Sequence, residues 1–225
     1  MSSAAPKFPL LFVAALVAGV SYWIGGQHTE PALLPMAWKG SGVGLLALWA
    51  ALNARNRDGW QIAAVLALGA LGDVVLERSQ AGGGGAFLAG HIVAAALYWR
   101  HHRMKRTPSQ TALALLLLVG TPLIAFLLPA DRAAAPLIAV YALGLGAMAG
   151  SAWASTFPRY RLGIGAVMFA ASDLLIFAKL GPLAASPLLH LLIWPLYFGG
   201  QALIAWGAVT TLLRWKADEE LHHRL

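Results

Sequence analysis

Long apolar runs, separated by short polar or basic stretches, fill almost the whole chain. Eight of these runs are each long enough to cross the hydrocarbon core of a bilayer, roughly 30 Å, as an α-helix. They cover residues 8–25, 33–52, 61–77, 86–99, 110–129, 134–156, 161–179 and 185–213. The fourth run is short, and the eighth is long and contains Pro195, which predicts a kink or an interfacial first turn. We therefore expect one all-α domain over residues 1–225, a bundle of eight transmembrane helices.

The composition supports this fold class. Of the 225 residues, 59% are hydrophobic and only 11% are charged, which is typical of a polytopic membrane protein rather than a soluble domain. The chain has no Cys, which excludes disulfides, thiolate catalysis and Cys-ligated metal. A net charge of +7 can indicate nucleic-acid binding, but in a membrane protein it more often reflects basic cytoplasmic loops. We therefore expect membrane lipids as partners and no nucleic acid.

The basic residues predict the orientation of the helices. With the N-terminus and the C-terminus both cytoplasmic, the Lys and Arg residues concentrate on the inner side, which is the positive-inside pattern. Seven or nine helices would break this pattern, so the first run is expected to be a retained helix and not a cleaved signal peptide. The localisation predicted is a multi-pass protein of the bacterial inner (cell) membrane. Twelve of the 16 Lys and Arg residues then lie inside: Lys7, Arg55, Arg57, Arg100, Arg103, Lys105, Arg106, Arg159, Arg161, Arg214, Lys216 and Arg224.

Few polar residues remain inside the predicted spans, and they lie at similar depths in the membrane, counted from the nearest cytoplasmic Arg. At about 1.5 Å per helical residue, Asp173 lies about 18 Å beyond Arg161, and Asp73 about 24 Å beyond Arg57. An ionisable residue at such depth is costly and is a functional candidate by default. One buried polar pocket explains the shared depth. Its expected residues are Lys39, Asp73, His91, Tyr141, Ser172, Asp173 and Gln201.

Three further features of the sequence add to these expectations. Gly72-Asp73 and Ser172-Asp173 lie 100 residues apart in similar apolar contexts, which suggests two four-helix halves in parallel orientation, with both Asp residues facing one cavity. The run Gly82–Gly85 is not followed by the Lys-Ser or Lys-Thr of a phosphate loop, so we expect a flexible external turn there. Glu77 and Lys179 fall near outer helix ends, where snorkelling would suffice.

These residues also resemble a known family. The chain is similar to the YhhN family of integral membrane proteins, whose characterised members are lysoplasmalogenases. The similarity is carried by Gly165-Ala166, Phe169 and Ser172-Asp173, by Tyr197-Phe-Gly-Gly-Gln201-Ala-Leu-Ile, by Gly72-Asp73, by Tyr141 followed by Met148, and by Lys39. Two positions depart from the family pattern. Gly40 stands where a Pro usually follows the Lys, and Ala94 stands three residues after His91, where the family has a Tyr that arrives here as Tyr98.

The resemblance implies hydrolysis of the vinyl ether of a lysoplasmalogen to a fatty aldehyde and a glycerophospho-ethanolamine or glycerophospho-choline. Protonation of the vinyl β-carbon gives an oxocarbenium ion, to which water adds. The reaction needs a proton donor, a negative charge and a base, roles that two carboxylates can divide, as in glycosidases. Asp73 and Asp173 are the expected catalytic pair, and no metal or cofactor is expected. The expected substrate-binding residues are Lys39, Tyr141, Gln201, Tyr197, His91 and Ser172.

Other interpretations of the same residues stay open. Both Asp residues could instead hydrogen-bond across the bundle in a structural role, and Gln201 and Tyr141 could join helices. A transporter could use the acids to bind substrate or relay protons. A lipid-binding or scaffold protein would need no turnover at all.

Overall fold

The structure is a computed structural model that describes residues 5–26 and 32–223. Every named element within these residues is a helix, which confirms the all-α prediction. Two short π-helical segments, η2 and η3, extend their neighbours without a break, so the elements form eight helical rods. The elements are α1 (Pro9–Gly25), α2 (Leu33–Asn53), α3 (Arg57–Leu76), α4 (Gln80–Arg100), α5 (Pro108–Leu115), η2 (Leu116–Gly120), α6 (Thr121–Leu127), α7 (Ala135–Ala154), η3 (Arg159–Gly163), α8 (Ile164–Lys179) and α9 (Leu188–His222).

Six of the rods within the described residues are long and apolar enough to cross a membrane. The chain is therefore a multi-pass membrane protein by the length and composition of its helices. The other two rods fall short for different reasons: α1 is apolar but has only 17 residues, whereas α2 has 21 residues but is less apolar. Whether these two also span the bilayer, and with them the count of eight spans, stays a prediction.

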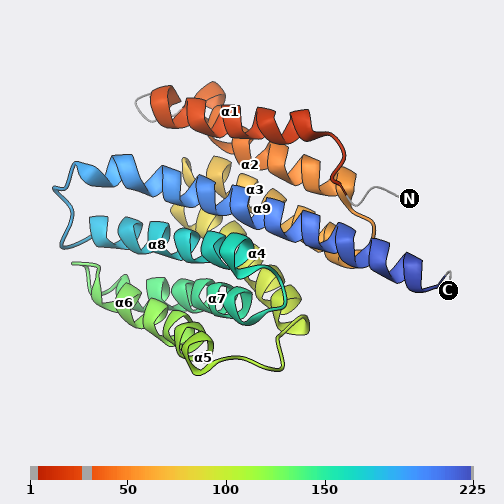
Figure 1. Cartoon of the computed structure of the whole chain (residues 1–225). Coiled ribbons are helices and arrows are strands. Elements are labelled where there is room, and N and C mark those ends of the chain that lie inside the picture. The colour runs from red at the N-terminus through yellow and green to blue at the C-terminus, as the bar shows by residue number, and fades with distance from the viewer. Residues whose placement is uncertain (1–4, 27–31, 224–225) are drawn as a thin grey trace.

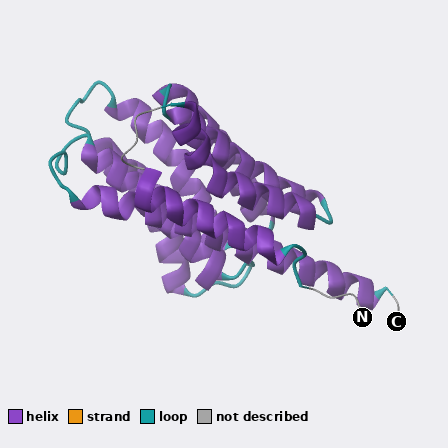
Figure 2. Cartoon of the chain, turned by 90° about the horizontal axis from the view of Figure 1, so that it is seen from above, coloured by secondary structure: helices purple, strands orange, loops and turns teal. Residues whose placement is uncertain are grey.

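Helix α9 contacts α1, α2, α3, α8 and η3, whereas α4 and the α5–η2–α6 rod pack against α7. In Figure 1, α1 and α2 lie on one side of the bundle, and the α5–η2–α6 rod lies on the opposite side, against α7. Figure 2 shows the last turns of α9 extending beyond the neighbouring helices. The sequence predicted that this helix would end at residue 213. The structure continues it through the polar segment to His222, and keeps Pro195 inside it.

Helices α8 and α9 cross at two glycines. An added Cβ at Gly165 would lie 2.6 Å from the carbonyl oxygen of Gly200, and one at Gly200 would lie 2.6 Å from that of Gly165. Without side chains at these positions the two backbones approach closely, which is a common way to pack helices in membranes. This crossing fixes Asp173 on α8 relative to Tyr197 and Gln201 on α9.

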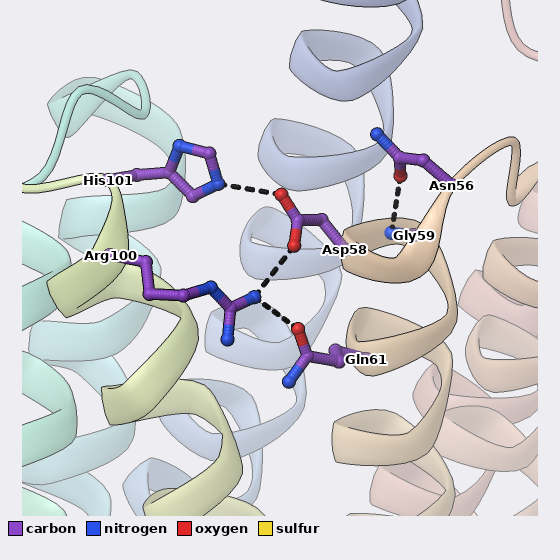
Figure 3. A network of polar contacts seen from close by, with 6 residues as sticks. All are labelled: Asn56, Asp58, Gly59, Gln61, Arg100 and His101. Atoms are coloured by element: carbon purple, nitrogen blue, oxygen red, sulfur yellow. Dashed lines mark hydrogen bonds and ion pairs between the residues drawn. The ribbon is translucent and has the colours of Figure 1, made fainter.

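A polar cluster joins the start of α3 to the end of α4 (Figure 3). The side chain of Asn56 caps α3 by accepting a hydrogen bond from the backbone N–H of Gly59 at 2.9 Å. Asp58, in the first turn of α3, accepts from Arg100 Nη2 at 2.7 Å and lies 2.7 Å from His101 Nε2. Arg100 also donates to Gln61. An acid at a helix N-terminus and a base at a helix C-terminus are both favourable for the helix dipoles.

The first helix, α1, begins at this same end of the bundle, and the last helix, α9, ends there. Asn53, the last residue of α2, accepts from the backbone N–H of Lys7 at 2.6 Å and donates to the carbonyl of Lys7 at 3.1 Å. On the other side of the cluster, the ring of His101 lies 5.1 Å from that of Trp215 near the end of α9. Of the predicted inner-side basic residues, Lys7 and Arg100 take part in these contacts, and Arg224 lies outside the described residues. Two statements remain predictions: that this end faces the cytoplasm, and that the chain contains an internal repeat.

The expected external turn at Gly82–Gly85 is wrong. These glycines form the start of α4, which Ser79 caps by accepting a hydrogen bond from the backbone N–H of Gly82 at 3.0 Å. Packing against α3 explains the helix: an added Cβ at Gly83 would lie 2.6 Å from Leu76 Cα. Gly82 and Gly83 thus stand where α3 and α4 approach closely.

The same glycine run gives a test of helix formation. Added Cβ atoms at Gly84 and Gly85 meet nothing within 4 Å. Gly84→Ala and Gly85→Ala should therefore each stabilise the protein by about 0.5–1 kcal/mol, because Ala restricts the unfolded chain and favours helix. Gly83→Ala, with backbone in its way, should lower stability. Thermal unfolding in detergent checks this, and stabilisation by all three changes would contradict the close contact with Leu76.

Candidate functional site

A cavity of about 360 Å³ lies between α1, α2, α3, α8 and α9, with Phe87 of α4 at its inner end, at the end of the bundle opposite the Asp58 cluster. Its floor is deep in the bundle, and its mouth is formed where α3 and α8 end and α9 begins. Apolar side chains, among them Met36, Ile176 and Trp194, line much of its wall. The polar side chains that line it are Tyr22, Lys39, Asp73, Glu77, Ser172, Asp173, Lys179, His190 and Tyr197.

Asp73 lies at the floor of the cavity on α3. It is 2% exposed, and Tyr197 Oη donates a hydrogen bond to its Oδ2 at 2.7 Å. Gly72, the residue before it, leaves room for the ring of Phe87, because an added Cβ would lie 2.7 Å from that ring. The Gly72-Asp73 pair thus places the carboxylate beside the ring of Phe87, where the phenol of Tyr197 can donate a hydrogen bond to it.

Asp173 lies at the same floor on α8 and is 6% exposed. Tyr141 Oη donates to its Oδ2 at 2.7 Å, and His91 Nε2 lies 3.2 Å from the same phenol oxygen. Because the single phenol proton goes to the carboxylate, the phenol oxygen is left to accept from His91. A chain of hydrogen bonds therefore runs from Asp173 through Tyr141 to α4.

Ser172 also lines the cavity, but its hydroxyl is already engaged. Its Oγ donates to the backbone carbonyl of Ile193 on α9 at 3.0 Å. The bond crosses to a neighbouring helix rather than to the backbone of its own. Ser172 therefore joins α8 to α9 directly beside Asp173.

The mouth of the cavity is charged. Lys39 and Glu77 form a salt bridge in which their side chains are 15% and 27% exposed. Lys179 and His190 lie farther out and are exposed. The cavity therefore changes from mixed charges at its opening, through apolar walls, to two buried carboxylates.

The structure brings five of the eight predicted site residues to this cavity: Lys39, Asp73, Ser172, Asp173 and Tyr197. The other three lie behind it. Tyr141 reaches it only through Asp173, and His91 and Gln201 line a separate inner cavity of about 20 Å³. These three residues support the floor and do not form its wall.

Several cavity residues escaped the sequence reasoning. Glu77 and Lys179 were attributed to snorkelling, although Glu77 stands four residues after Asp73, on the same face of α3. That spacing was the available signal. His190 carries no such signal, because it precedes the deep polar layer in its span. Among residues 5–26 and 32–223, no group of three or more metal-ligating side chains is present.

The arrangement has clear chemical capabilities. Two carboxylates from different helices, each held by a phenol, can donate a proton, accept one, or stabilise a cation between them. The apolar walls suit an alkyl chain, and the charged mouth suits a polar headgroup. The floor and the mouth together fit a small amphiphile.

Comparison with known proteins identifies one family. The model of the YhhN family matches residues 34–208, which include the polar residues of the cavity except Tyr22. Neither a curated protein nor a solved structure shows a significant match to the chain.

Proposed function

The chain belongs to the YhhN family, and on this premise we propose that it is a membrane lysophospholipid hydrolase that cleaves the vinyl ether of a lysoplasmalogen. The products are a fatty aldehyde and a glycerophospho-ethanolamine or glycerophospho-choline. The proposal includes a location in the bacterial inner membrane, where the substrate would reach the cavity from the bilayer.

One observation carries the proposal: Asp73 and Asp173 line the same cavity, deep inside the bundle. Each accepts a hydrogen bond from its own tyrosine, so neither carboxylate depends on the other to be satisfied. Two buried acids with different partners can hold different protonation states, which an acid–base reaction requires.

The proposed chemistry uses the two acids in turn. One carboxylic acid protonates the β-carbon of the vinyl ether, and the resulting oxocarbenium ion is stabilised by the other, ionised carboxylate. That carboxylate then takes a proton from a water molecule while the water oxygen attacks the cation. The hemiacetal collapses to aldehyde and alcohol, and a final proton transfer restores the first acid. The net reaction consumes one water and no cofactor.

The mouth supports binding of a zwitterionic headgroup. Lys179 and Lys39 can meet a phosphate, and Glu77 can meet an ammonium group. Lys179→Gln should therefore raise KM about three- to ten-fold with little change in kcat, since a partly exposed ion pair contributes about 1 kcal/mol. Steady-state kinetics at constant detergent concentration checks this. Lys105→Gln, at the opposite end of the bundle, is the control, and an equal effect of both would refute a headgroup role.

Aldehyde release by purified protein tests the proposal. A 1-alkenyl lysophospholipid should yield one fatty aldehyde for each headgroup product. The matched 1-alkyl lipid has a saturated ether, cannot form the oxocarbenium ion by protonation, and should stay intact. Absence of aldehyde from the alkenyl lipid in active preparations would reject the proposal.

A carrier is the second candidate, because the cavity lies near one end of the bundle and carries protonatable groups at its floor. In sealed vesicles a carrier would accumulate the lipid or its headgroup unchanged, and more so under a proton gradient. Uptake without aldehyde would favour it over the hydrolase.

A further inference from the structure

Behind the floor of the main cavity lies a second, smaller cavity of about 20 Å³. Phe87 lines both cavities, so its ring is part of the partition between them. Phe87 meets Phe169 and Tyr197 in edge-to-face contacts, with ring centroids 6.2 and 5.9 Å apart. The inner cavity is large enough for one water molecule, which needs about 10–15 Å³.

Three polar side chains line this small space. Tyr98 is fully buried, and its Oη has no hydrogen-bond partner among the described residues. Gln201 is 3% exposed and His91 is 4% exposed. A buried hydroxyl without a partner is costly, and native proteins usually satisfy such a group with a side chain or an ordered water.

The inner cavity is connected to both carboxylates through the two tyrosines. His91 binds Tyr141, which donates to Asp173. On the other side, Gln201 Nε2 and Tyr197 Oη both approach Gly69, at 2.8 and 3.7 Å from the position of an added Cβ. Tyr197 donates to Asp73. The groups around the inner cavity therefore touch the residues that orient each acid.

We propose that the inner cavity binds one ordered water molecule, held by Tyr98 together with His91 and Gln201. A water here satisfies the Tyr98 hydroxyl and fixes the imidazole and the amide, which in turn hold Tyr141 and Tyr197 against the carboxylates. Tyr98 is thus a positioning residue, seven residues and two helical turns after His91 on the same face of α4. The role in turnover rests on the proposed function, whereas the water site does not.

X-ray radiolytic footprinting of the full-length protein tests the water site without any assay of activity. Bound water produces hydroxyl radicals in place, and these oxidise adjacent side chains. Tyr98 should be oxidised several times faster than Trp49, which is also fully buried but has its indole N–H bonded to the carbonyl of Lys7. Equal protection of both rings would overturn the water site.

The Tyr98→Phe variant supplies the second readout. If the hydroxyl holds a water, its removal should leave the Tm unchanged or lower it. A higher Tm would overturn the proposal, because it would mean that an unsatisfied group had been removed from a dry site. In an active preparation the variant should lose kcat several-fold with KM unchanged. Fast oxidation of Tyr98 with unchanged kcat would keep the water and refute the positioning role.

The two proposals fail separately. If the protein releases no aldehyde but Tyr98 is oxidised rapidly, the hydrolase is rejected and the water site stands. If aldehyde is released but Tyr98 is as well protected from oxidation as Trp49, the hydrolase stands and the water site is rejected.

Discussion

Asp73→Asn and Asp173→Asn should each lower kcat for lysoplasmalogen hydrolysis by about 10²–10⁴-fold, the contribution of a general acid or base in enzymes. An amide has nearly the shape of the carboxylate and still accepts a hydrogen bond from Tyr197 or Tyr141, so each variant should fold. It cannot donate a proton to carbon, carry a negative charge, or take a proton from water. Single-turnover release of aldehyde measures the loss, and the unfolding temperature in detergent verifies the fold.

Asp131→Asn is the matched control. Asp131 lies in the loop before α7 and is exposed, and among the described residues it accepts a hydrogen bond only from the backbone N–H of Ala133, at 2.9 Å. This change should leave kcat within two-fold of the unaltered protein, because exposed side chains away from the reacting atoms contribute little. Full turnover by either floor variant would exclude that acid from the mechanism. Full turnover by both would end the case for two-acid catalysis.

Gly200→Ala should be the most destabilising single-methyl change among the glycines of α9. The added Cβ would lie 2.6 Å from the carbonyl oxygen of Gly165, and neither backbone can give way without separating α8 from α9. Overpacking of this kind costs about 1–3 kcal/mol or more. Because the crossing sets the distance between Asp173 and Tyr197, activity should fall together with stability.

The adjacent glycine supplies the control for this crossing. An added Cβ at Gly199 meets only the Met168 Cε atom, at 3.1 Å, which is the flexible end of a side chain. Gly199→Ala should therefore have little effect on the unfolding temperature or raise it slightly. Equal tolerance of both changes would mean that α8 and α9 are farther apart than the structure places them.

The deep acids could be predicted from the sequence because carboxylates in apolar spans stand out against their neighbours. Counting residues from the nearest basic side chain placed Asp73 and Asp173 at similar depths, and the structure brings both to one floor. Their rotation toward a common cavity does not follow from depth. It depends on the Gly165–Gly200 crossing and on the space that Gly72 leaves for Phe87, which are three-dimensional contacts.

The differences between the predictions from sequence and the structure also have physical causes. The glycines at 82–85 were interpreted as an external turn, but they belong to α4, and Gly82 and Gly83 pack closely against α3. The last turns of α9 were missed because the apolar pattern marks only the part of a helix that packs or meets lipid. The Lys39–Glu77 pair was missed because each residue, taken alone, has an adequate explanation at the membrane surface.

The contacts of Lys7 with Asn53 and of His101 with Trp215 have a practical corollary. Since α1 starts and α9 finishes at the same end of the bundle, we expect reporter domains fused to the two chain ends to report the same compartment. A split fluorescent protein, with one fragment fused to each end of the chain, should therefore reassemble and become fluorescent within a single molecule. The last turns of α9, which extend beyond the neighbouring helices, should give the second fragment clearance from the bundle.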